Sequence, residues 1–208
     1  PPNLDGIIMW PGFAGGLNWG GIGWDPDRQI MVTTVKRLAM FLQLHERADY
    51  EGADRVEGRQ YTGQEGTPYG MSRQPLVSPS GLPCNPPPFG TLVAVDLSDG
   101  TIRWERPLGT IPGLAEVPGS EEWGSLVFGG PLVTAGGLTF VAAGQDDRIR
   151  AFDTETGEVL WEHQLPAGGQ AAPMSYRING RQYVVIVAGG RGGIGSAGDY
   201  IVAFALPA

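Results

Sequence analysis

Few residues of this 208-residue sequence have the types and spacing that catalysis requires. The two histidines, His45 and His163, lie far apart, and His163 follows the Trp of a repeated motif, so both are more typical of structural or solvated residues than of ligands. Cys84 is the single cysteine, which excludes an internal disulfide and a cysteine-based metal site. No Ser/His/Asp order, phosphate-binding loop or dense carboxylate cluster is present in the sequence. These residues therefore indicate no catalytic residue and no metal ligand in this chain.

One short stretch has the composition of a binding surface. Asn18-Trp19 is flanked by Gly15-Gly16 and Gly20-Gly21. Glycines on both sides would let the backbone approach another group closely, and a flat group could lie there. The alternative is that Trp19 is a packing residue at a junction and the glycines form turns. The residues alone leave both interpretations open.

A repeat predicts the elements that position these residues. Ala94–Trp104 and Ala151–Trp161 share the pattern Ala-x-Asp-x-x-Thr/Asp-Gly-x-x-x-Trp and begin 57 residues apart. The pattern predicts strand, tight turn, strand: Asp96 and Asp153 bond the turn amides, the Gly takes a positive φ, and the Trp covers the hairpin. Repeats of this size built from hairpins are typical of propeller blades, so the fold class is predicted to be an all-β propeller.

The composition agrees with a turn-rich all-β protein. Gly (34) and Pro (18) make up about a quarter of the chain, but hydrophobic residues make up 41%, which argues against disorder. The net charge of −8 argues against nucleic-acid binding. The longest apolar run, Tyr183–Ala188, is too short to span a bilayer.

The N-terminal half is predicted to hold two strands and a long loop. The strand-like residues 29–34 are expected to pair with residues 37–44. From 45 to 90 the chain is polar and rich in breakers, which predicts a long ordered loop without strands.

The C-terminal half is predicted to hold further hairpins. Two strands should meet at 135–137, and a hairpin over 174–188 should turn at Asn179-Gly180. Residues 200–206 form a last strand that would complete a blade begun elsewhere. Two full repeats with partial flanking ones cannot close a ring, so the sequence is expected to be a fragment or one chain of an assembly.

Several strings carry a resemblance to a known family. The two copies of the repeat look like the tryptophan-docking motif of the eight-bladed quinoprotein alcohol dehydrogenases, which use pyrroloquinoline quinone. Other strings resemble the membrane-type quinoprotein glucose dehydrogenases, and the similarity covers nearly the whole of residues 1–208. These strings are Asn18-Trp19-Gly20-Gly21 with Asp25-Pro26, Gly81-Leu82-Pro83-Cys84-Asn85-Pro86-Pro87 with Phe89-Gly90, Leu165-Pro166-Ala167-Gly168-Gly169-Gln170, and the ending from Gly198 to Pro207.

The resemblance implies that the chain is about the last three blades of a single propeller domain. It implies a periplasmic dehydrogenase for a sugar or polyol, attached to the inner membrane through a segment outside this chain, that passes electrons to ubiquinone. The quinone would lie beside Ca²⁺ or Mg²⁺, and the catalytic base, the main metal ligands and a lysine near the quinone would belong to the remaining blades. This chain alone is therefore expected to be inactive.

The resemblance also implies site residues. Asn18 and Trp19 occupy a position at the cofactor rim, and Thr34 stands near a place where the glucose enzymes can carry an Asn, so all three are predicted to bind the cofactor. Arg191 stands where those enzymes place a His linked to sugar selectivity. It could favour a carboxylated substrate such as quinate, or be a solvent-facing loop residue. The alternatives to a sugar dehydrogenase are thus a dehydrogenase for a quinate-type cyclic acid and a non-catalytic propeller scaffold.

Overall fold

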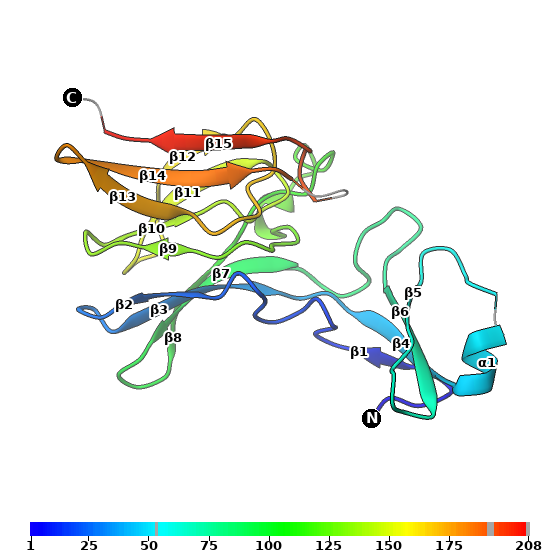
Figure 1. Cartoon of the computed structure of the whole chain (residues 1–208). Helices are drawn as coiled ribbons and strands as arrows, with labels where there is room; N and C mark the ends of the chain where they lie inside the picture. Colours follow the sequence, from blue (N-terminus) through cyan, green and yellow to red (C-terminus); the bar gives the residue numbers. More distant parts are fainter. Residues whose placement is uncertain (53, 191–193, 207–208) are drawn as a thin grey trace. The chain divides into compact units, whose positions relative to one another are not determined.

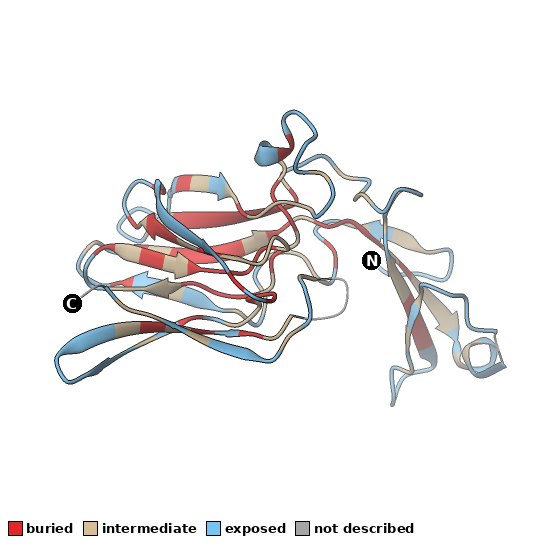
Figure 2. Ribbon diagram, turned by 90° about the horizontal axis from the view of Figure 1, so that it is seen from above, coloured by how far each residue is buried: buried red, intermediate tan, exposed pale blue. Residues whose placement is uncertain are grey.

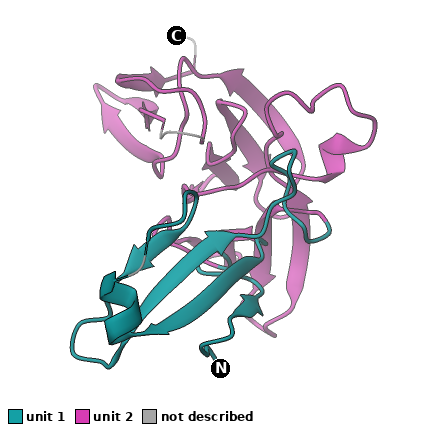
Figure 3. Cartoon of the chain, turned by 90° about the vertical axis from the view of Figure 1, so that its right-hand side faces the viewer, with its two compact units in different colours: residues 1–16, 37–86 teal, residues 17–36, 87–208 magenta. Residues whose placement is uncertain are grey.

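The computed structural model describes residues 1–52, 54–190 and 194–206. The chain divides into two compact units, shown in different colours in Figure 3. Unit 1 comprises Pro1–Gly16 and Arg37–Pro86, and unit 2 comprises Leu17–Lys36 and Pro87–Ala208. Unit 1 is thus built from the N-terminal segment and from an insertion between two strands of unit 2.

Unit 1 is a four-stranded antiparallel sheet in the order β1-β4-β6-β5, with one short helix. Its buried apolar side chains include Leu42 on β4 and Met71 on β6. Its elements are β1 (Ile7–Met9), β4 (Met40–Glu46), α1 (Arg47–Gly52), β5 (Gln60–Thr62) and β6 (Tyr69–Pro75).

Two predictions for this region are wrong. Residues 37–44 do not pair with 29–34: β4 pairs with β1 and β6. The predicted strand-free loop over 45–90 contains α1, β5 and β6. Strand β6 is not predicted because, apart from its first residue, its sequence lacks the β-branched and aromatic residues typical of strands: it reads Tyr-Gly-Met-Ser-Arg-Gln-Pro. Its extended conformation is stabilised by pairing with β4 over seven residues.

Unit 2 contains, within the described residues, three antiparallel sheets that stack face to face in the order of the chain (Figure 1). The first sheet has the order β2-β3-β7-β8, the second β12-β11-β10-β9, and the third β13-β14-β15. A one-turn 3-10 helix, Ser120–Glu122, lies in the connection between the first two. The strands are β2 (Ile22–Asp25), β3 (Ile30–Lys36), β7 (Gly90–Asp96), β8 (Ile102–Pro107), β9 (Leu132–Val133), β10 (Leu138–Val141), β11 (Arg148–Asp153), β12 (Val159–Gln164), β13 (Met174–Ile178), β14 (Arg181–Ala188) and β15 (Tyr200–Phe204).

The core of unit 2 lies between these sheets. One cluster joins the first two sheets through residues such as Val32, Leu92 and Phe152, and a second joins the next pair through residues such as Ile149 and Ile186. Figure 2 shows that buried residues concentrate on the middle strands, while turns and edge strands are exposed. Neighbouring sheets therefore bury their facing sides against each other, as propeller blades do.

The predicted hairpins of this unit are confirmed. Strands β9 and β10 meet at 135–137, and β13 and β14 turn at Asn179-Gly180, where both residues have a positive φ (49° and 80°) as the turn type requires. Among the described strands, β15 pairs only with β14.

The two repeat copies form the same local structure. The Asp96 carboxylate accepts a hydrogen bond from the Ser98 amide at 2.9 Å, and the Asp153 carboxylate accepts bonds from two turn amides at 2.8 Å. Gly100 and Gly157 have φ values of 77° and 69°. The turn-stabilising role predicted for the two aspartates is confirmed.

The tryptophan of the first copy also reaches beyond its own hairpin. Trp104 stands opposite Ala94 of its own hairpin, and both belong to one buried cluster. Its Nε1 also donates to the Thr154 carbonyl oxygen at 3.0 Å, and its ring lies against Gly157, on the turn of the second copy. The ring is buried between two sheets and joins one blade to the next. Trp161, at the same position of the second copy, is 38% exposed.

Candidate functional site

The Asn18-Trp19 stretch forms a turn that leaves the indole ring exposed. The Asn18 side-chain oxygen accepts a hydrogen bond from the Trp19 amide at 2.8 Å, and the Asn18 carbonyl accepts one from the Gly21 amide at 3.0 Å. Trp19 is 62% exposed. Its ring is not enclosed by packing in this chain and is free to cover another group.

The glycine after Trp19 allows a close backbone contact, as predicted. A Cβ atom on Gly20 would lie 2.6 Å from the carbonyl carbon of Gly129 and from the amide nitrogen of Gly130. The group that approaches Gly20 is therefore the backbone of the segment that leads to β9. This contact fixes the Trp19 turn to the second sheet.

Thr34 lies behind this contact. It is 4% exposed, and its hydroxyl donates to the Gly129 carbonyl oxygen at 2.8 Å. The neighbouring Thr33 hydroxyl donates to the Gly21 carbonyl oxygen at 3.0 Å. Both threonines thus hold the backbone around Trp19, and the Thr34 oxygen retains only acceptor capacity.

The next residue on the same face of β3 is a lysine that sequence reasoning missed. Ile30 and Val32 point into the core between the first two sheets, and Thr34 and Lys36 follow them at the spacing of two that places strand residues on one face. Lys36 is 1% exposed. Its Nζ lies 4.5 Å from the centre of the Phe128 ring and has no hydrogen-bond partner among the described residues.

The described residues around Lys36 do not offset the cost of burying its positive charge. Burial lowers the pKa of the ammonium group to about 8. The cation–π contact with Phe128 returns at most about 2 kcal/mol, whereas the desolvation of an unpaired ammonium ion costs several kcal/mol. Two signals in the sequence could have identified this residue: it is the only lysine of the chain, and it continues the alternating pattern of a buried strand.

Lys36 and Trp19 lie at the same end of the first sheet. Strands β2 and β3 are antiparallel, with Ile22 opposite Thr33. Trp19 lies three residues before Ile22 and Lys36 three residues after Thr33, so both lie beyond the same end of this strand pair. We call the group formed by Asn18, Trp19, Thr34, Lys36 and Phe128 the rim.

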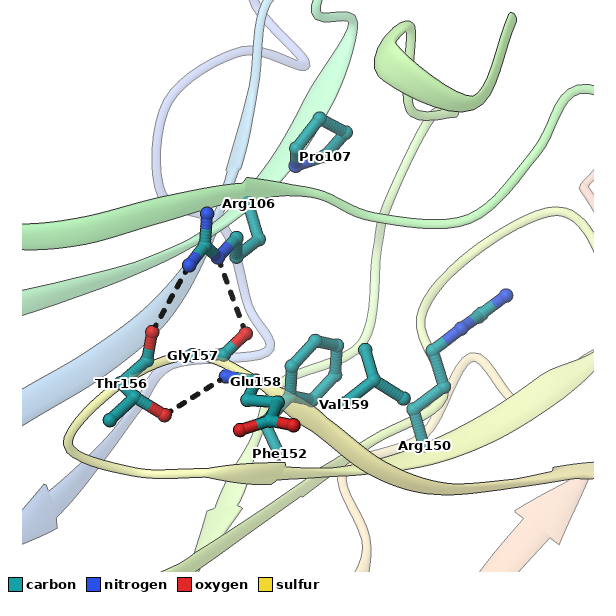
Figure 4. A pocket seen from close by; sticks show the side chains of 8 residues that line it. All are labelled: Arg106, Pro107, Arg150, Phe152, Thr156, Gly157, Glu158 and Val159. Atoms are coloured by element: carbon teal, nitrogen blue, oxygen red, sulfur yellow. Dashed lines mark hydrogen bonds between the residues drawn. The ribbon is translucent and has the colours of Figure 1, made fainter.

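The hollow drawn in Figure 4 lies outside the rim. It has a volume of about 520 Å³ and lies between β8 and the turn that joins β11 to β12. Arg106, from β8, donates to the carbonyl oxygens of Gly157 and Thr156 at 3.3 Å each, and the Glu158 amide is bonded to the Thr156 hydroxyl. These polar groups hold the blade junction next to Trp104, so the hollow is a feature of packing.

The remaining candidate residues contribute little to a site. His45 Nε2 lies 2.7 Å from the Ser72 hydroxyl, and the His163 ring stacks on Trp161. Arg191, the predicted selectivity residue, lies outside the described residues. In the part of the chain that the structure describes, no three His, Cys, Asp or Glu side chains come together in a way that could hold a metal ion.

Comparison with known proteins decides the family. Residues 1–184 match the family described as "Glucose/ethanol/alcohol dehydrogenase, beta-propeller domain". The chain belongs to this family. The predicted fold class is confirmed as well, because a quinohemoprotein alcohol dehydrogenase from Comamonas testosteroni superposes on 96% of the chain, and on 28% of its own, with a TM-score of 0.64 at 24% identity.

The relatives of this family member are named for different substrates. It is 41% identical over its whole length to the quinoprotein glucose dehydrogenase of Escherichia coli. It is 38% identical to the quinate/shikimate dehydrogenase (quinone) of Acinetobacter baylyi over 99% of its length, and 38% identical to the glycerol dehydrogenase large subunit of Gluconobacter oxydans over all of it.

This member of the dehydrogenase family spans only part of its relatives. It covers 28%, 27% and 31% of the lengths of those three proteins. Among its described elements, no helix has the length and apolar composition needed to cross a bilayer.

Proposed function

We propose that this chain is part of the propeller of a dehydrogenase that uses pyrroloquinoline quinone to oxidise a sugar or polyol of the glucose type. The observation that carries the proposal is the Trp19 ring, which is 62% exposed on a turn that Gly20 and Thr34 anchor. An exposed indole on a rigid backbone suits the face of a flat aromatic cofactor, because stacked rings attract one another.

The residues of the rim fit such a cofactor. The Asn18 side-chain oxygen is occupied by the Trp19 amide, so its amide nitrogen remains as a donor. Thr34 offers a hydroxyl oxygen and holds the Gly129 carbonyl in place. In this proposal Trp19 covers the quinone, Asn18 donates to it and Thr34 supports the backbone behind it.

In this proposal the groups that carry out the chemical steps lie outside this chain. When bound, the quinone supplies a two-electron acceptor and Ca²⁺ or Mg²⁺ supplies Lewis acidity. The remaining blades would provide the catalytic base and the metal ligands. We further propose that the enzyme acts on the periplasmic side of the inner membrane, is attached through a segment outside this chain, and reduces ubiquinone.

A second candidate substrate is a cyclic hydroxy acid such as quinate. The quinate/shikimate dehydrogenase is nearly as similar to this chain as the glucose enzyme, at 38% against 41% identity. Arg191, in place of a His, would bind its carboxylate through two hydrogen bonds. Oxidation rates of glucose, glycerol and quinate at saturating cofactor distinguish a sugar or polyol dehydrogenase from a quinate-type dehydrogenase. In a quinate-type enzyme, Arg191→His should lower the oxidation rate of quinate and leave the other rates unchanged.

The proposed role of Trp19 is tested by measuring quinone binding to the complete dehydrogenase of which this chain is proposed to be part, called here the parent enzyme. Trp19→Ala is expected to weaken quinone binding about tenfold or more, as the loss of one aromatic stack requires. Trp24→Ala is the matched control, because Trp24 is 55% exposed on β2, towards the other end of the same sheet. Equal quinone affinities in the two variants would remove Trp19 from the site. A wild-type enzyme that binds no quinone would instead indicate a non-catalytic propeller.

A further inference from the structure

The rim contains a cation, Lys36, whose ammonium nitrogen has no hydrogen-bond partner among the described residues. Lys36 is 1% exposed, and its Nζ lies over the face of the Phe128 ring, 4.5 Å from the ring centre. Its backbone is held in the seven-residue register between β3 and β7, where it stands opposite Gly90. The ammonium group therefore has a rigid position and three N–H donors that no described residue uses.

We propose that Lys36 binds a carboxylate of the small molecule held at the rim. This inference rests on the proposed function and adds a ligand group to it. A carboxylate matches a desolvated ammonium group better than a neutral acceptor does, since charge-assisted hydrogen bonds are about twice as strong as neutral ones.

Two molecules at the rim would present this chemistry. Pyrroloquinoline quinone carries carboxylates on its ring system, and a cyclic hydroxy acid substrate carries one as well. The position of Lys36 suits both molecules, because Lys36 and Trp19 lie beyond the same end of the β2–β3 pair. Thr34, two residues before Lys36, donates to the carbonyl oxygen of Gly129, the residue after Phe128. The effect of burial on the ammonium group agrees with this role, since burial lowers the pKa of Lys36 to about 8 and a bound carboxylate would raise it.

Lys36→Met separates this role from a structural one. Methionine has a similar length and can keep the contact with Phe128, and replacing a buried unpaired charge by an apolar side chain does not lower stability. The ligand-free variant should therefore melt at the wild-type temperature or above it. Arg103→Met is the control, because it removes one positive charge from β8 of the same sheet, near the turn where Arg103 pairs with Asp96.

The test uses the parent enzyme and two kinds of ligand. Dissociation constants are measured for pyrroloquinoline quinone and for its methyl ester by equilibrium dialysis, and KM values are measured for glucose and quinate at saturating quinone. If Lys36 binds the cofactor, Lys36→Met weakens quinone binding about 10- to 100-fold and leaves ester binding unchanged. If it binds the substrate, quinone binding stays constant and only the KM for quinate rises by a similar factor.

If Lys36→Met changes neither quinone binding nor the KM for quinate, the proposed role of Lys36 is wrong and the proposed function still stands. A wild-type enzyme that neither binds quinone nor oxidises an alcohol would overturn both.

Discussion

The junction made by Trp104 gives the most direct stability prediction. Trp104 is 8% exposed, its ring packs on Gly157, and its Nε1 donates to the Thr154 carbonyl oxygen at 3.0 Å. Truncation of a buried Trp typically costs about 3–5 kcal/mol. Trp104→Phe keeps most of the packing and loses the hydrogen bond, which leaves a carbonyl unpaired at a cost of about 1–3 kcal/mol. We expect Trp104→Ala to lower the free energy of unfolding by about 3–5 kcal/mol and Trp104→Phe by about 1–3 kcal/mol.

Trp161 is the matched control for this experiment, since it stands at the same position of the second copy. It contacts only His163 and Phe204 among the described rings, at centroid distances of 6.0 and 5.2 Å, and is 38% exposed. In the 208-residue chain, Trp161→Ala should cost about 1–2 kcal/mol. The assay is urea unfolding followed by circular dichroism. The result would refute docking of Trp104 on the next turn as the source of stability if the two alanine variants lost the same free energy of unfolding, within about 0.5 kcal/mol.

Three further results are expected. Gly157→Ala should cost about 2–5 kcal/mol, because the residue has φ 69° and its Cβ would lie 2.6 Å from the Trp104 ring, whereas Gly100→Ala, at the same turn position with open space around it, should cost only about 1–2 kcal/mol; urea unfolding compares them. Thr139→Val should cost about 1–3 kcal/mol in the same assay, because it removes the 2.8 Å bond to the buried Thr154 hydroxyl; Thr134→Val, at a half-buried hydroxyl near the same hairpin, should cost less. The Thr156 amide, with other turn donors, holds the pKa of Asp153 below its ordinary value. A carboxylate with a lowered pKa stabilises the fold above its unfolded pKa of about 4, and this stabilisation is lost as the pH falls through the folded pKa. The difference in unfolding free energy between wild type and Asp153→Asn should therefore narrow below pH ~4. A constant difference from about pH 6 to 3 would contradict this.

Features that depend only on neighbouring residues could be predicted from the sequence. The turns at Asp96 and Asp153, the positive φ of their glycines and the Asn179-Gly180 hairpin follow from side-chain hydrogen bonds and backbone freedom within a few residues. The repeat of these turns was enough to predict blades and, with the longer strings, the family.

Strand pairing and side-chain docking between segments distant in the chain could not be predicted from the sequence. Strand β6 has no local β signature and forms because β4 supplies a seven-residue ladder, and β3 pairs with β7, more than fifty residues away in the chain, instead of with the next strand-like run. The docking of Trp104 on the following copy also needs two blades to be in place.

The rim shows the same division. Its exposed members, Asn18 and Trp19, were found from their glycine-rich surroundings, whereas Lys36 was missed because a lysine is ordinarily a surface residue. Only the packing of β3 between β2 and β7, with Phe128 over the ammonium group, reveals that this lysine is buried. The desolvation free energy of the ammonium group depends on the atoms that surround it, and most of these are distant in sequence. It can therefore be judged only from the folded chain.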